Sequence, residues 1–144
     1  MAYPVAHVAA FLSGTWVVDR EIVDSLRGAA GTFHGTADFT AQGDGLSWVE
    51  AGELQWAADT HKAGRRLLVA VRPCLPCVVD AAFDDGRFFH RADLSSGGDT
   101  FVHGCAPDIY SGSWTVISRN RFQLTWDVEG PAKRMTIRSI YSRA

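Results

Sequence analysis

The sequence predicts an all-β domain: an antiparallel barrel of about eight to ten strands, preceded by one short helix. Three observations support this fold class. From Thr15 onward apolar and polar residues alternate with a period of two, which is typical of strands with one buried face. Gly, Asp and Asn recur at intervals suited to short hairpins, and no long stretch has helical periodicity. The chain has 144 residues, which suits a single domain spanning 1–144.

The composition excludes several classes of partner. Hydrophobic residues make up 47% and charged residues 21% of the chain, and the formal net charge is -2. Without a basic excess, nothing favours nucleic acid or a membrane surface. The apolar N-terminal run is too short to span a bilayer, and no basic residue precedes it, so we expect a cytoplasmic protein. The expected partner is a small molecule, and a homodimer is left open.

The elements can be placed in order along the chain. Val5, Val8, Ala9 and Leu12 recur at helical spacing and predict a short amphipathic helix that ends at Gly14. The alternating segments then predict strands at residues 15–24, 31–42, 46–57, 66–72, 78–84, 87–94, 99–105, 108–118, 121–129 and 133–143. The segment 57–65 between two of them is interpreted as a surface loop.

Several charged residues fall in phase with the apolar face of these strands. The strand at 121–129 has a purely apolar inner face, but other strands carry polar residues in phase with their core positions: Arg20, Asp24, Glu50, His90, His103, Asp108 and Lys133. A closed apolar core does not accept such charges without partners. The pattern therefore predicts a polar, ligand-sized cavity that aromatic residues such as Trp48 and Trp126 also line. The alternative is that some of these residues reach solvent at the barrel rim.

Turn signals predict which inner residues meet. A two-residue turn centred on Ser96-Gly97 would pair His90 with His103, Phe88 with Cys105 and Ala92 with Phe101. Similarly, the turn signal Asp85-Gly86 would pair Phe83 with Phe88. Two histidines directly opposite each other are less common than a single core histidine. We therefore expect His90 and His103 to line a functional pocket.

The three cysteines give no strong signal. Cys74 and Cys77 form a CxxC, but the residues after it look like a strand, whereas a thioredoxin-type redox motif opens a helix. A zinc site would need His103 and Cys105 as further ligands. A turn that happens to hold two thiols is the simpler interpretation, and we expect neither a metal nor another cofactor.

As a set, several motifs resemble a bacterial and fungal family known as domain of unknown function 6314. The resemblance covers nearly the whole chain and rests on Phe11-Leu12-Ser13-Gly14-Thr15-Trp16, Arg20-Glu21-Ile22-Val23-Asp24, Gly45-Leu46 to Glu50-Ala51-Gly52, Asp85-Gly86-Arg87-Phe88-Phe89-His90, residues 103–110, residues 126–133 and Tyr141-Ser142-Arg143. It implies a small calycin-like or lipocalin-like barrel, but no activity. It places motif residues at Arg20, Asp24, His90, His103, Cys105, Asp108, Tyr110 and Lys133. The Cys74/Cys77 region departs from the family pattern, so a family-wide redox or zinc role is not expected.

Three functional classes fit these residues. In a cofactor-independent cyclase, isomerase or lyase, His90 or His103 would move a proton, Asp24 or Asp108 would orient an imidazole, and a further group would stabilise negative charge: Arg20, Tyr110 or Lys133. In a carrier or sensor, the same side chains would only orient a ligand. In a metal-dependent enzyme, the two histidines would join Glu50 or Asp108. We favour the first class, with His90, His103, Asp108 and Tyr110 as the catalytic set. Arg20, Asp24, Trp48, Glu50, Trp126 and Lys133 would then bind the ligand.

Overall fold

The computed structural model describes residues 2–144, which form one short helix and ten strands. The elements are α1 (Val8–Leu12), β1 (Gly14–Asp24), β2 (Ala29–Gln42), β3 (Gly45–Trp56), β4 (Asp59–Arg72), β5 (Leu75–Phe83), β6 (Phe88–Asp93), β7 (Gly98–Cys105), β8 (Asp108–Ser118), β9 (Arg121–Gly130) and β10 (Lys133–Arg143). Every hydrogen-bonded ladder is antiparallel. The predicted all-β fold class, with one short N-terminal helix, is confirmed.

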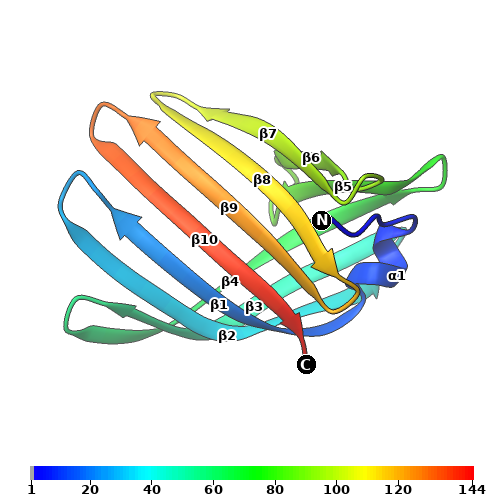
Figure 1. Ribbon diagram of the computed structural model, residues 1–144, viewed down its shortest axis with the longest axis horizontal. Helices are drawn as coiled ribbons and strands as arrows, with labels where there is room; N and C mark the ends of the chain where they lie inside the picture. The colour runs from blue at the N-terminus through cyan, green and yellow to red at the C-terminus, as the bar shows by residue number, and fades with distance from the viewer. Residues whose placement is uncertain (1) are drawn as a thin grey trace.

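The strands form one sheet that curls into a nearly closed barrel (Figure 1). Their order is β6-β5-β4-β3-β2-β1-β10-β9-β8-β7, so consecutive strands pair as hairpins, and β1 pairs with β10. Within residues 2–144 no ladder joins β6 to β7, although the chain connects them directly. We call this unpaired boundary the seam. It is the one place in the described sheet where the barrel wall lacks backbone hydrogen bonds across it.

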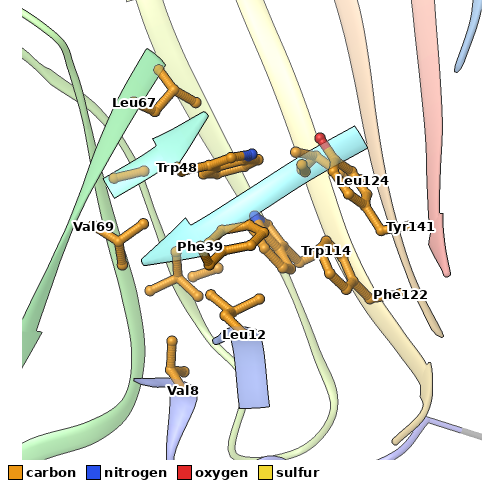
Figure 2. Close-up of a cluster of buried hydrophobic side chains, with 14 of the residues drawn as sticks. Val8, Leu12, Phe39, Trp48, Leu67, Val69, Trp114, Phe122, Leu124 and Tyr141 are labelled. Atoms are coloured by element: carbon orange, nitrogen blue, oxygen red, sulfur yellow. The ribbon is translucent and has the colours of Figure 1, made fainter. Parts of the chain in front are cut away.

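The helix α1 covers one end of the barrel with apolar side chains. Val8 and Leu12 are buried and reach toward Phe39 and Trp114 (Figure 2). The indole Nε1 of Trp16 donates to the Leu12 carbonyl oxygen at 2.8 Å and so ties the helix to β1. Burial of large aromatic and aliphatic side chains is the main stabilising term in such a core. This end is therefore closed by packing.

The opposite end of the barrel carries hairpin turns. The β1–β2, β3–β4 and β9–β10 turns lie at this end in Figure 1, away from α1. No helix in residues 2–144 covers it. We refer to it as the open end. Interior side chains near it are only half-buried: Leu54, Phe83, Phe101, Tyr110 and Ile137.

The boundaries of two elements differ from prediction. The helix begins at Val8, because Tyr3 and Val5 instead donate backbone hydrogen bonds to Val116 and Leu94. The segment 57–65 is not a loop: β4 already begins at Asp59, after a tight turn in which Ala57 has a φ of 55°. A non-glycine residue in the left-handed region gives no sequence signal for such a turn.

A β-bulge changes which β6 side chains face inward. Ala81 pairs with His90, but Ala82 pairs with Phe88, so Phe89 is the extra residue. As a result Phe89 and His90 are both buried, while Phe88 is 54% exposed. The predicted inward position of Phe88 is therefore wrong. The predicted pairing of Phe83 with Phe88 is also wrong, since the Phe83 N–H donates to the carbonyl oxygen of Arg87.

The predicted cross-strand pair of His90 and His103 is not formed. The turn runs from the Leu94 carbonyl to the Gly97 N–H and is thus centred one residue earlier than expected. After this turn β7 pairs with β8, so that His103 lies opposite Tyr110. The other two predicted pairs, Phe88 with Cys105 and Ala92 with Phe101, are absent from the described ladders for the same reason.

Candidate functional site

Glu50 on β3 is the centre of a polar network inside the barrel. It is 2% exposed. Its Oε1 accepts hydrogen bonds from Arg20 Nη2 at 2.8 Å and from Arg65 Nε at 2.9 Å. Its Oε2 accepts from Trp48 Nε1 at 3.0 Å and from the Tyr141 hydroxyl. Four donors, two of them cationic, offset the cost of burying a carboxylate.

Strand geometry explains how these residues meet. Trp48 and Glu50 lie two residues apart on β3, so their side chains share the inner face. Arg65 on β4 is the direct cross-strand partner of Glu50. Arg20 extends into the interior from β1. Its Nε donates to Ser139 Oγ at 2.6 Å, and its guanidinium lies 5.0 Å from the ring centre of Phe33.

The charge states of this network follow from the same contacts. Burial alone would raise the pKa of Glu50, but the charges of Arg65 and Arg20 and the hydrogen bond from Tyr141 lower it to about 2. Burial and the Glu50 charge raise the pKa of Tyr141, so its phenol stays protonated. At neutral pH the network therefore holds two cations and one anion, an excess of one positive charge.

His90 on β6 is a neutral, buried imidazole. It is 1% exposed, and burial, followed by the charge of Arg65 and the proximity of His103, lowers its pKa from 6.5 to about 3. Its Nε2 lies 3.0 Å from Nε1 of Trp114, which can only donate. The neutral ring must therefore carry its proton on Nδ1. That Nδ1–H has no hydrogen-bond partner within residues 2–144.

Trp126 on β9 holds a second donor without an acceptor. It is 5% exposed, and its Nε1–H likewise has no partner in the described chain. Its ring centre lies 5.3 Å from that of His90, in an edge-to-face arrangement. Nearly all buried polar groups in proteins are hydrogen-bonded, so two adjacent exceptions are unusual. The described side chains and backbone around these two N–H groups therefore offer them no hydrogen-bond acceptor.

Aromatic rings enclose this pair. Phe101 on β7 stacks on His90 at 4.7 Å between ring centres, and Phe89 stacks on Trp126 at 4.9 Å. Because β6 carries His90 and Phe89 while β7 carries Phe101, this aromatic group lies at the seam. Stacked side chains and a hydrogen bond from the Asp93 N–H to the Asp99 carboxylate connect the two strands, which share no backbone ladder.

His103 and Tyr110 lie nearer the open end. They are cross-strand partners with ring centres 6.0 Å apart, and both are half-buried. The ring centre of His103 is 5.6 Å from that of Phe89, which links the two histidines through one aromatic ring. Asp108 and Lys133 form an ion pair at 3.4 Å beyond them. Tyr110 and Asp108 raise the pKa of Lys133.

The predicted site residues thus fall into three groups. His90 and Trp126 form the layer with unpaired donors, and His103 and Tyr110 lie close to it. Arg20, Trp48 and Glu50 belong to the polar network. Arg65, a further member of this network, lowers the pKa of His90 through its charge. The remaining three lie at strand ends on the rim of the open end: Asp24 ends β1, Asp108 begins β8 and Lys133 begins β10. Asp24 uses its carboxylate to accept the backbone N–H groups of Leu26 and Arg27 in the β1–β2 turn.

Sequence reasoning misses two important residues. It places Arg65 in the surface loop predicted at residues 57–65, where β4 in fact begins. A recognised turn at Ala57-Ala58 would have placed Arg65 opposite Glu50. Tyr141 lies in the inner set of β10, but nothing in the alternation of residues indicates that its hydroxyl reaches Glu50.

Metal-ligating side chains do not gather in the described chain. Residues 2–144 contain no group of three or more His, Cys, Asp and Glu side chains arranged to hold an ion. Cys74 and Cys105 are exposed, and Cys77 is half-buried. Nor does any helix in the described part have the length and apolar character needed to cross a bilayer.

Proteins of known structure share this fold at low sequence identity. The S-type phycobiliprotein lyase CPES from Guillardia theta matches with a TM-score of 0.65 and 8% identity, over 99% of this chain and 93% of that chain. A protein of unknown function from the DUF3598 family of Nostoc punctiforme matches with a TM-score of 0.65 and 9% identity, over 99% of this chain and 51% of that one. The redesigned β-barrel mFAP1, bound to DFHBI, matches with a TM-score of 0.51 and 18% identity, over 96% and 100% of the two chains.

A comparison with curated proteins found no match. The similarity to the solved structures establishes the lipocalin-like barrel, which the sequence motifs had implied. A family model matches residues 12–143, nearly the whole chain. The protein belongs to the family of unknown function DUF6314.

Proposed function

We propose that this protein binds a small organic molecule inside the barrel, between the aromatic group at the seam and the open end. The observation that carries the proposal is the pair of buried donors, His90 Nδ1–H and Trp126 Nε1–H, which have no acceptor within residues 2–144. An unsatisfied buried donor costs about 1–3 kcal/mol, and a ligand oxygen would remove that cost. The bound molecule therefore carries a hydrogen-bond acceptor.

The surroundings of these donors support an organic ligand. The aromatic rings of Phe89, Phe101 and Trp126 offer flat apolar surfaces, and small-molecule sites typically combine such surfaces with a few orienting polar groups. Among the proteins of similar fold, mFAP1 is bound to DFHBI, and CPES is a phycobiliprotein lyase. Both agree with a barrel that takes up a small molecule.

The indole N–H signals of the protein offer a direct test. A library of fragments containing carbonyl or carboxylate groups is screened by nitrogen–proton correlation spectra, with the Trp126 signal assigned from Trp126→Phe. Binders should move the Trp126 signal downfield, because its free N–H gains an acceptor. The Trp16 signal is the internal control, since its N–H already donates to Leu12 at the helix-covered end. The proposal fails if no fragment binds, or if binders shift Trp16 and leave Trp126 unchanged.

A second candidate function is cofactor-independent acid–base catalysis of the isomerase, cyclase or lyase type. One observation favours it: His103 lies 5.6 Å, between ring centres, from the Phe89 ring beside the two donors and is half-buried rather than enclosed. Donors aimed at a ligand oxygen stabilise negative charge that develops there, while a nearby imidazole moves the proton. His90 cannot be that base near neutral pH, because its pKa is lowered to about 3. In this candidate His90 donates a hydrogen bond and His103 transfers the proton.

Deuterium incorporation separates catalysis from binding. Each fragment that binds is incubated with the protein in deuterated water and analysed by mass spectrometry. Acid–base catalysis predicts deuterium at a ligand carbon, and His103→Gln should abolish it without loss of binding. Absence of incorporation for every binder would leave the carrier or sensor function and contradict the catalytic one.

A further inference from the structure

We infer that the bound molecule is a flat organic carboxylate and that Arg65 is the residue that selects its charge. This inference rests on the proposed binding function and names the chemical class of its ligand. Arg65 is placed by its pairing with Glu50, so its side chain enters the barrel interior from β4. The side chain is nevertheless 34% exposed, whereas that of Glu50 beneath it is 1% exposed. Arg65 thus forms the solvent-facing surface of the polar network.

The guanidinium of Arg65 has unused donors. Its Nε donates to Glu50 at 2.9 Å and the Tyr141 hydroxyl is a second partner, which leaves three of its five N–H groups for a ligand. By contrast, Arg20 uses both Nε and Nη2 on Ser139, Glu50 and Tyr141. Arginine recognises carboxylates with paired N–H groups in a planar fork. Of the two arginines in the network, Arg65 is the one that both reaches solvent and retains donors for a ligand.

The local charge balance favours an anion. Arg20 and Arg65 carry two positive charges, and Glu50 carries one negative charge. The ring of His90 is neutral, and the raised pKa of Tyr141 keeps its phenol uncharged. Asp108 and Lys133 neutralise each other at the rim. Asp24 is engaged at the end of β1, where its carboxylate accepts the backbone N–H groups of Leu26 and Arg27.

Two tryptophan rings link Arg65 to the unpaired donor of His90. Its guanidinium lies 5.6 Å from the ring centre of Trp48, whose ring centre lies 6.0 Å from that of Trp114, the hydrogen-bond partner of His90. Its charge contributes to the lowered pKa of His90. A ligand that satisfies the donors of His90 and Trp126 would therefore lie within the field of Arg65. A carboxylate is the acceptor group that combines a hydrogen bond to these donors with attraction to the charge of Arg65.

Paired probes test the charge preference. The affinities of 2-naphthoate and its neutral analogue 2-naphthamide are measured by isothermal titration calorimetry on the full chain. The two probes share one ring system and differ in charge, and the carboxylate should bind about ten-fold tighter or more. In Arg65→Gln this preference should disappear through weaker binding of the naphthoate, with naphthamide affinity unchanged. Arg138→Gln, which removes an exposed charge on the outer face of β10, should keep the preference.

The outcomes distinguish this inference from the function on which it rests. Equal binding of both probes would overturn the carboxylate assignment and leave small-molecule binding standing. A preference that survives in Arg65→Gln would overturn the role of Arg65. Failure of both probes to bind would also overturn the assignment, while the fragment screen on the Trp126 signal decides the binding function separately. If Arg65→Gln is too unstable to titrate, Arg65→Lys keeps the charge, loses the planar fork and should show an intermediate preference.

Discussion

Two tryptophans inside the barrel differ mainly in whether the indole N–H has a partner. Trp114 donates to His90 Nε2, and Trp126 donates to nothing in the described chain. Both are buried, so replacement by phenylalanine removes a similar volume from each. Trp114→Phe should cost about 1–3 kcal/mol more than Trp126→Phe, because it also leaves the His90 acceptor unpaired. Urea unfolding of both variants measures the difference. Equal losses would mean that Trp126 has a partner in the free protein.

His90 makes the stability depend on pH. The unfolded chain binds a proton at this imidazole near pH 6.5, whereas the folded protein binds it only near its lowered pKa of about 3. The contribution of neutral His90 to the free energy of unfolding is therefore complete above pH 6.5. It is lost progressively as the pH falls toward 3, at about 1.4 kcal/mol per pH unit. Glu50, with its pKa lowered to about 2, adds a loss in the same direction below about pH 4.5.

The interval between pH 6.5 and 4.5 isolates the histidine. His90→Gln keeps an acceptor for Trp114 and removes the titrating ring, so its unfolding free energy should be nearly flat across this interval. His61→Gln changes an exposed histidine on β4 and should retain the slope of the parent protein. Chemical denaturation at several pH values provides the comparison. An unchanged slope in His90→Gln would show that other groups cause the acid sensitivity.

Among the elements, β2 and β3 approach each other so closely that glycine is required. Gly35 pairs directly with Gly52, and a Cβ on Gly52 would overlap the carbonyl oxygen of His34 and the Cα of Gly35. The overlap is with backbone, which cannot move aside without distorting both strands. This close approach lies in the strand that carries Glu50.

Gly52→Ala should therefore destabilise the protein by about 1–3 kcal/mol. Gly104→Ala on β7 is the matched control, since a Cβ at this position would meet no atom within 4 Å and its φ is not in the left-handed region. The control should be neutral or slightly stabilising, because alanine restricts the unfolded chain. Thermal melts compare the two. A larger loss for Gly104→Ala than for Gly52→Ala would contradict the described β2–β3 contact.

The elements also show what a sequence can predict. Alternation and turn residues located all ten strands, and the inward phase of Trp16, Trp48 and Phe122 agrees with their burial. The same reasoning failed where the chain departs from strict alternation. The bulge at Phe89 turns Phe88 outward, and the Ala57-Ala58 turn lacks the residues that usually mark one. These local irregularities depend on contacts between strands, which a single strand pattern does not contain.

The candidate site was predictable to a similar degree. The in-phase charges correctly indicated that Glu50 and His90 face inward. Their partners were missed for two reasons: the unrecognised turn at Ala57-Ala58 hid the pairing of Arg65 with Glu50, and Tyr141 reaches Glu50 from β10, which the register of a single hairpin does not reveal. The two unpaired donors are likewise a property of three-dimensional packing: each residue alone looks like an ordinary core side chain.

At the scale of the whole molecule, the seam is the weakest part of the barrel wall. The described ladders pair β1 with strands on both sides, whereas β7 pairs only with β8. Amide hydrogen exchange should therefore be faster in β7 than in β1. A ligand that packs against Phe101 and His90 should slow exchange in β7 and β6 more than in β1. Equal protection of β7 and β1 in the free protein would indicate that the seam is closed in solution.

The proposed binding function requires that a ligand oxygen complete the hydrogen bonds of His90 and Trp126. Its most direct test is a crystal structure of the protein with the tightest fragment from the indole screen. We predict an acceptor oxygen of that molecule within about 3.2 Å of both His90 Nδ1 and Trp126 Nε1. A structure with the fragment bound elsewhere, and with ordered water on these two nitrogens, would contradict the proposal.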